Sequence, residues 1–121
     1  MRDEGLYLDD LLEAADSIQR FVSGLKEEDF LNNDLVKSAV IQKLGVIGEA
    51  AAHISDQTKI KYPKIKWKSM KGLRNIAVHA YFSINWNTVW KTVQTEIGLL
   101  KAEIAEIIRA DFPFPNTTEP Q

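Results

Sequence analysis

The 121-residue sequence contains no cysteine, which excludes disulfide bonds and thiolate metal sites. No apolar run approaches the roughly 18 residues that a membrane-spanning helix needs, and no segment alternates apolar and polar residues as a half-buried strand does. The first residues also lack the apolar stretch of a secretory signal. We therefore expect a single soluble, cytoplasmic domain with no membrane association, no metal site and no cofactor.

Acidic residues are missing from a long internal stretch. Residues 57–95 include no Asp or Glu but contain seven lysines and one arginine, so this basic segment carries +8 and the rest of the chain −10. A basic segment on an acidic body is typical of a docking surface for a polyanion, and its candidate RNA-binding residues are Lys64, Lys66, Lys68 and Lys71. A solvated lysine-rich loop explains the charge alone equally well.

Apolar residues recur every three or four positions in four segments, as in amphipathic helices. The first segment ends near Gly24. The second, from about Leu35 to Lys61, is apolar around most of its circumference, so we expect it to be central. Asn32-Asn33-Asp34 precedes it and predicts its N-cap.

The third predicted helix begins at Trp67, and Gly72 within it suggests the close approach of a backbone or ligand. Ser83-Ile84-Asn85 closes this helix and caps the fourth, which has an apolar seam in steps of four and three over residues 86–107. We predict an all-α, up-and-down bundle of four main helices over residues 1–111, with a Pro-containing tail at 112–121.

A polar stripe follows the second predicted helix. The offsets of three and four stack its members on one face: Gln42, Gly45, Glu49, His53 and Asp56. Because polar groups on a buried helix need partners, Glu49 is a candidate for orienting a functional side chain. The alternative is that Glu49 and His53 satisfy each other or nearby backbone.

The stretch Arg74-Asn75-Ile76-Ala77-Val78-His79-Ala80-Tyr81 holds the candidate chemistry. An arginine that stays charged, a histidine that titrates near neutrality and a phenol can together bind and rearrange a phosphodiester. Arg74 would stabilise charge on the phosphate, and His79 would transfer protons. On an α-helix the two side chains would lie roughly 140° and about 7.5 Å apart, so we expect them to line a groove.

With this motif and the residues given below, the sequence resembles the HepT-type toxins of the HEPN superfamily. These are small helical ribonucleases encoded beside a minimal nucleotidyltransferase in bacteria and archaea. The resemblance covers nearly the whole chain, and Ala80 departs from it, because many relatives have an acidic residue there. It rests on Tyr7-Leu8, Leu11-Leu12, Ile47-Gly48-Glu49-Ala50-Ala51, Pro63, Ile65, Trp67, Gly72-Leu73-Arg74-Asn75, His79, Tyr81, Phe82, Val89 and Trp90.

The resemblance implies a metal-independent RNA endonuclease with Arg74 and His79 as catalytic residues, leaving a cyclic phosphate. Asn75 and Glu49 would support the site. The resemblance also implies that the antitoxin nucleotidyltransferase inhibits the toxin by attaching AMP to Tyr81, although this tyrosine could instead stack on a base. The substrate class is RNA, with tRNA and mRNA as candidates.

Proton transfer in this reaction needs an acid and a base, but each chain has one motif histidine, His79. A homodimer with a shared groove would supply two, through an interface on either the apolar seam or the second helix. Two rival functions remain: a non-catalytic helical subunit that binds a nucleotidyltransferase, and a structural dimerisation module. His79 separates them from the nuclease, because a binding module has no obvious need for it.

Overall fold

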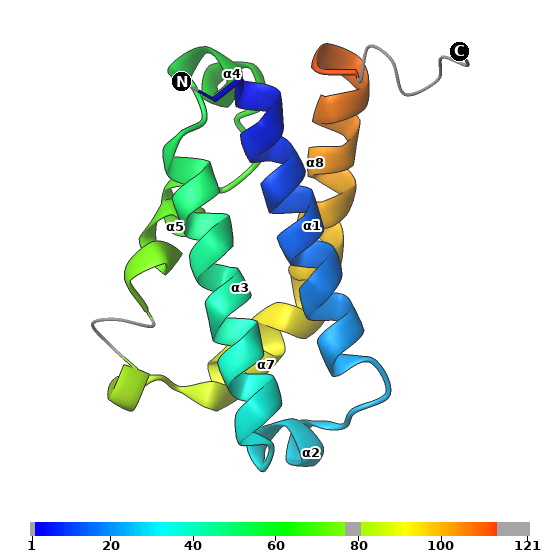
Figure 1. Cartoon of the computed structure of the whole chain (residues 1–121), viewed down its shortest axis with the longest axis vertical. Coiled ribbons are helices and arrows are strands. Elements are labelled where there is room, and N and C mark those ends of the chain that lie inside the picture. The colour runs from blue at the N-terminus through cyan, green and yellow to red at the C-terminus, as the bar shows by residue number, and fades with distance from the viewer. Residues whose placement is uncertain (1, 77–80, 114–121) are drawn as a thin grey trace.

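The computed structural model describes residues 2–76 and 81–113, and these residues form helices and connecting turns without a strand. The three longest described helices are α1 (Glu4–Val22), α3 (Asp34–Ala52) and α8 (Ile97–Asp111). Helix α1 packs against both α3 and α8, and it runs antiparallel to them (Figure 1). The predicted all-α class is confirmed.

Helix α1 begins and ends where its sequence signals place it. The Asp3 side chain accepts a hydrogen bond from the backbone N–H of Gly5, which caps the first turn. After the last helical residue, Gly24 adopts a positive φ of 79°, as expected where the chain turns away from a helix. The apolar face of α1 is fully buried and centres on Leu8, Leu11 and Ile18.

A short helix, α2 (Glu27–Leu31), precedes α3 and was not predicted. It buries Phe30 completely, against the rings of Trp86 and Trp90. The predicted N-cap of the second helix is confirmed, because the Asn33 side chain accepts a hydrogen bond from the N–H of Val36 at the start of α3.

The prediction of one continuous second helix over residues 35–61 is wrong. Helix α3 ends at Ala52, and a separate helix, α4 (Asp56–Lys61), follows. Ser55 causes the break: its hydroxyl caps α4 by accepting from Thr58 N–H, and its own N–H donates to the Glu4 carboxylate at 2.8 Å. The apolar pattern gave no sign of this break, because Ile54 and Thr58 are buried on either side of it.

The fourth predicted helix is also divided, into α7 (Trp86–Thr95) and α8, which meet at an angle (Figure 1). Asn85 caps α7 as predicted. Near the junction the Thr95 hydroxyl donates to the carbonyl of Lys91, a contact that bends helices. The buried seam residues belong to the chain's own core, so the seam packs inside the bundle: Val93, Ile97, Ile104 and Ile107.

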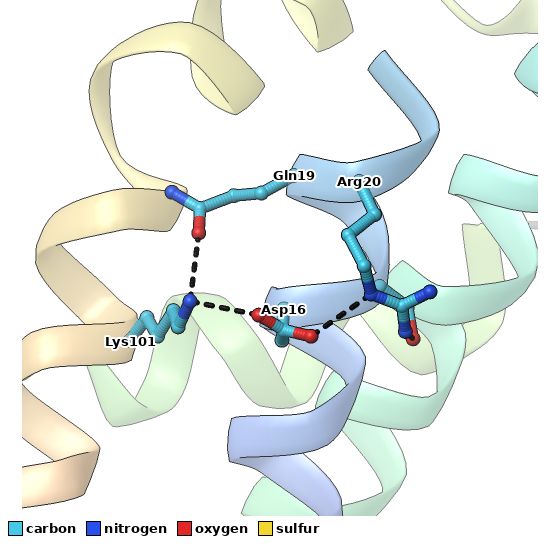
Figure 2. A network of polar contacts seen from close by, with 5 residues as sticks. Asp16, Gln19, Arg20 and Lys101 are labelled. Carbon is cyan, nitrogen blue, oxygen red and sulfur yellow. Dashed lines mark hydrogen bonds and ion pairs between the residues drawn. The ribbon is translucent and has the colours of Figure 1, made fainter. Parts of the chain in front are cut away.

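A charged network joins α1 to α8 (Figure 2). The Lys101 ammonium donates to Asp16 Oδ1 at 2.8 Å and to Gln19 Oε1 at 3.2 Å. The other Asp16 oxygen accepts from Arg20 Nε at 3.0 Å, and Arg20 also donates to the buried Ser17 hydroxyl. The hydrogen bonds from Lys101 and Arg20 hold the pKa of Asp16 below its usual value.

A second cluster anchors the start of the basic segment to the end of α8. The Tyr62 hydroxyl donates to Asp111 Oδ2 at 2.7 Å, and Lys61 Nζ lies 3.0 Å from the same carboxylate. Both contacts lower the pKa of Asp111, and the hydrogen bond from Tyr62 lowers it more than the contact with Lys61 does. Trp67 Nε1 then donates to the Tyr62 carbonyl. None of the helices in the described residues is both long enough and apolar enough to cross a bilayer.

Helix α8 ends at Asp111, and Phe112 still packs against Gly5 at the start of α1. Residues 114–121 lie outside the described part of the chain. A separate tail beginning at residue 112 therefore stays a prediction.

Candidate active site

The third predicted helix changes type before it reaches the motif. Helix α5 (Trp67–Lys71) continues into a 3₁₀ turn, η1 (Gly72–Asn75), which carries Arg74. A 3₁₀ turn has 3.0 residues per turn instead of 3.6, so the α-helical spacing predicted for Arg74 and His79 does not apply to its start. His79 and Ala80 lie outside the described residues, and the groove predicted to be lined by Arg74 and His79 stays a prediction.

Arg74 meets Glu49, another predicted site residue, although 25 positions separate them in the sequence. Arg74 Nη1 lies 3.9 Å from Glu49 Oε1, and the two side chains are 40% and 61% exposed. A long ion pair between exposed groups is weak. The guanidinium therefore lies beside Glu49 and stays accessible to an anion from solution. Asn75 follows in the same turn and is exposed.

Gly48 explains how η1 comes so close to α3. A Cβ at this position would overlap the backbone nitrogen of Arg74, and it would lie 2.8 Å from the Met70 carbonyl oxygen and 2.9 Å from Arg74 Cα. The sequence predicted the close approach of a backbone or ligand at Gly72, but among the described residues a Cβ there would meet nothing within 4 Å. The backbone contact lies at Gly48 instead, and a ligand at Gly72 stays a prediction. The sequence signal for Gly48 was a glycine beside a candidate site residue on a mostly buried helix.

His53 has a structural role in this geometry. It caps α3, and its Nδ1 lies 3.0 Å from the Glu49 backbone carbonyl. Because that oxygen can only accept, Nδ1 carries the proton. The imidazole stacks on Tyr7, with centroids 4.6 Å apart and planes 7° from parallel, and Nδ1 is 3.7 Å from Glu49 Oε2. His53 and Glu49 therefore contact each other, as the simpler interpretation proposed.

The polar stripe of α3 and α4 faces solvent instead of buried partners. Gln42, Glu49, His53 and Asp56 are all exposed. Helix α3 is central, as predicted, because it packs against α1, α2, α5 and η1, and the stripe lies on the face that these elements leave uncovered. The mean apolarity of a helix does not reveal which face is left open.

The four predicted RNA-binding lysines, Lys64, Lys66, Lys68 and Lys71, are all exposed. Lys64 and Lys66 also border a groove of about 550 Å³ that sequence reasoning missed. Its floor is apolar and includes Leu44 and Ile47 of α3, and the opposite wall comes from α7 and α8. No local pattern could have predicted this groove, because its two walls are formed by residues about 30 positions apart.

Tyr81 lies in a second 3₁₀ turn, η2 (Tyr81–Ser83), among other aromatic rings. Its ring meets Phe82 and Trp86 edge to face, at 5.6 and 5.9 Å between centroids, and Phe82 is fully exposed. The ammonium of Lys37 lies 4.9 Å from the centre of the Trp86 ring. Tyr81 is thus half-buried, with aromatic neighbours that suit stacking against a base.

Arg74 and Tyr81 are held near opposite ends of α3. Arg74 meets Glu49, which lies near the C-terminal end of α3. Tyr81 packs on Trp86, and the same Trp86 ring contacts Lys37, which lies near the N-terminal end of α3. Twelve helical residues separate Lys37 from Glu49, which corresponds to about 18 Å along the axis. Arg74 and Tyr81, the two described ends of the motif, therefore lie beside different parts of α3.

Comparisons with known proteins identify the family of the chain. A family model described as "Ribonuclease HepT-like" matches residues 11–107. A Methanocaldococcus jannaschii protein named a putative RNase is 38% identical over 85% of this chain and 94% of its own length. Another protein so named from that organism is 40% identical over 89% of each chain.

A third relative, the probable ribonuclease HepT of Thermococcus cleftensis, is 37% identical over 84% of this chain and 92% of its own length. No solved structure matches the chain significantly. Family model and relatives cover the helices that carry Glu49, Arg74 and Tyr81. The chain belongs to the HepT-like ribonuclease family.

Proposed function

We propose that this protein is a metal-independent RNA endonuclease and the toxin of a toxin–antitoxin system, with Arg74 and His79 as its catalytic residues. The observation that carries the proposal is the Arg74 guanidinium, which is 40% exposed and forms, within the described part of the chain, one ion pair, at 3.9 Å with Glu49. It lies within a segment that has no acidic residue of its own. Such a group can take a phosphate without first breaking a strong ion pair.

The reaction follows from these groups. The ribose 2′-oxygen attacks the adjacent phosphorus, the bond to the 5′-oxygen breaks, and a cyclic phosphate remains. One imidazole accepts the proton of the 2′-hydroxyl, and a second donates a proton to the leaving 5′-oxygen. In a homodimer, each protomer supplies one of these two imidazoles through its own His79. Arg74 stabilises the charge that grows on the non-bridging oxygens.

The remaining predicted residues have supporting roles in this proposal. Glu49 orients the Arg74 guanidinium, and Asn75 stabilises the turn or the phosphate through its amide. The lysines of the basic segment bind the RNA backbone without reading its sequence. Because the α7–α8 seam is buried within the chain, the second of the two predicted interfaces is favoured, and we place it at the first turn of α3, where the apolar Leu35 side chain is 80% exposed. The proposed substrate is cytoplasmic RNA, either tRNA or mRNA.

The test is cleavage of an end-labelled RNA by the purified protein with EDTA present, with Arg74→Ala and His79→Ala beside the wild type. We expect a cyclic-phosphate end from the wild type and at least about a 100-fold loss in each variant. Lys43→Ala, a change in a different face of α3, is the matched control. Equal residual cleavage in every sample would refute the proposal and favour a non-catalytic subunit of a nucleotidyltransferase.

Regulation is proposed at Tyr81: its phenolic oxygen would attack the α-phosphorus of ATP held by the cognate nucleotidyltransferase, lose its proton, take the AMP group and release pyrophosphate. An adenylyl group on η2 could occupy the surface between Tyr81 and Arg74 and compete with RNA for it. Intact-mass measurement after co-expression with that enzyme should show an added adenylyl mass that Tyr81→Phe abolishes. Retention of the added mass in Tyr81→Phe, with Tyr62→Phe as control, would place the modification elsewhere.

A further inference from the structure

We propose that Gly48 is a positioning residue for Arg74: the missing side chain at this position sets how deeply η1 sits against α3, and hence where the guanidinium lies. This inference rests on the proposed function of Arg74. It goes further by assigning the placement of that charge to a backbone contact and not to an ion pair.

The contact is backbone against backbone. A Cβ on Gly48 would overlap the Arg74 nitrogen and lie 2.8 Å from the Met70 carbonyl oxygen. Neither atom belongs to a flexible side chain that could rotate away. Any side chain at position 48 therefore has to push the whole turn outward, because α3 is packed on its other side against α1.

The displacement would act directly on Arg74. The Cα of Arg74 itself lies 2.9 Å from the Cβ position, so the atom from which the guanidinium extends moves with the turn. Glu49 is the next residue on α3, and its 3.9 Å pair with Arg74 has little strength to pull the guanidinium back. A misplacement on the order of 1 Å can slow a reaction about 100-fold.

The same helix provides a matched control one turn earlier. A Cβ on Gly45 would meet nothing within 4 Å. Gly45→Ala and Gly48→Ala are chemically identical changes, and both replace a glycine inside a helix, which in itself favours the folded state. Their difference therefore isolates the contact with η1 from the helix propensity of alanine.

The experiment measures kcat and KM for a short RNA with the wild type, Gly45→Ala, Gly48→Ala, Arg74→Ala and Gly48→Ala/Arg74→Ala. We expect Gly45→Ala to match the wild type and to melt higher. Gly48→Ala should lose about 10- to 100-fold in kcat/KM, divided between kcat and KM as in Arg74→Ala. Once Arg74 is absent, adding Gly48→Ala should change kcat/KM by less than about twofold.

Each outcome decides the proposal. Full activity in folded Gly48→Ala, or losses that multiply in the double variant, would overturn it. If Gly48→Ala alone does not fold, the same comparison is made with Gly45→Ala present throughout as a stabilising background. If the wild type itself does not cleave RNA, the proposed function fails, but the NMR shift of the Arg74 amide still tests the placement: it should move in Gly48→Ala and stay in Gly45→Ala.

Discussion

The α1–α8 contact and the α3–η1 contact are built in different ways. Between α1 and α8, charged side chains meet at 2.8 to 3.0 Å, with Asp16 shared by Lys101 and Arg20. Between α3 and η1, the backbones touch at Gly48, and the one charged pair described there, Arg74 with Glu49, spans 3.9 Å. Charged side chains thus join α1 to α8, whereas the close contact of η1 with α3 depends on the missing side chain of Gly48.

Under the proposed function, this difference has a reason. A guanidinium that made short, bidentate contacts with a carboxylate would have to lose them before it could bind a phosphate. Placing Arg74 through its backbone leaves its side chain in position and still available. The ion pairs between α1 and α8 have no such second role, so they can be as short as geometry allows.

The largest effect on stability should come from the core of the framework. Leu11 is fully buried on α1 where it faces α3 and α8. Leu11→Ala should lower the free energy of unfolding by about 2–5 kcal/mol, since it removes apolar contacts and leaves a cavity. Urea unfolding measures this change. Leu6→Ala, on the same helix but at a 44% exposed position, is the control and should cost far less; equal losses would contradict the core described above.

A smaller effect is expected from the network of Figure 2. Lys101 and Arg20 lower the pKa of Asp16. The ionised Asp16 carboxylate therefore stabilises the fold at pH values above its ordinary pKa of 3.8, and this contribution is lost as the pH falls through the lowered pKa. Asp16→Asn should therefore reduce the melting temperature at neutral pH and flatten its decline in acid.

Thermal melts from pH 7 to pH 2.5 test this, with Glu13→Gln, an exposed position on the same helix, as control. High salt should narrow the difference in melting temperature between wild type and Asp16→Asn, because the ion pairs of Asp16 with Lys101 and Arg20 are accessible to solvent. An unchanged acid profile in Asp16→Asn would show that the network does not hold α1 to α8.

The smallest effect on stability should come from Glu49→Gln. Its pair with Arg74 is long and exposed, so the free energy of unfolding should change by less than about 0.5 kcal/mol. Cleavage should fall by about tenfold at most, if Glu49 orients the guanidinium. A large loss of stability in this variant would remove the contrast with the α1–α8 contact.

The sequence predicted the fold class and several helix ends for local reasons. Asn33 and Asn85 cap α3 and α7 as expected, because a cap depends on a side chain and the backbone two or three residues away. The breaks at Ser55 and Glu96 were missed, because apolar periodicity continues across both of them. The approach of the backbones was placed at Gly72 for a similar reason: a glycine permits contact, but the sequence does not say which glycine is contacted.

What the sequence determined by itself is the set of chemical groups: an arginine, a histidine and a tyrosine in a segment without acidic charge, on amphipathic helices. What only the tertiary structure decided is where the arginine and the tyrosine lie around α3, with Arg74 near Glu49 at one end and Tyr81 on Trp86 toward the other. The physical reason is range. Charge, capping and periodicity act within a few residues, whereas the fit of η1 against Gly48 joins positions 26 residues apart and exists only after the helices have packed.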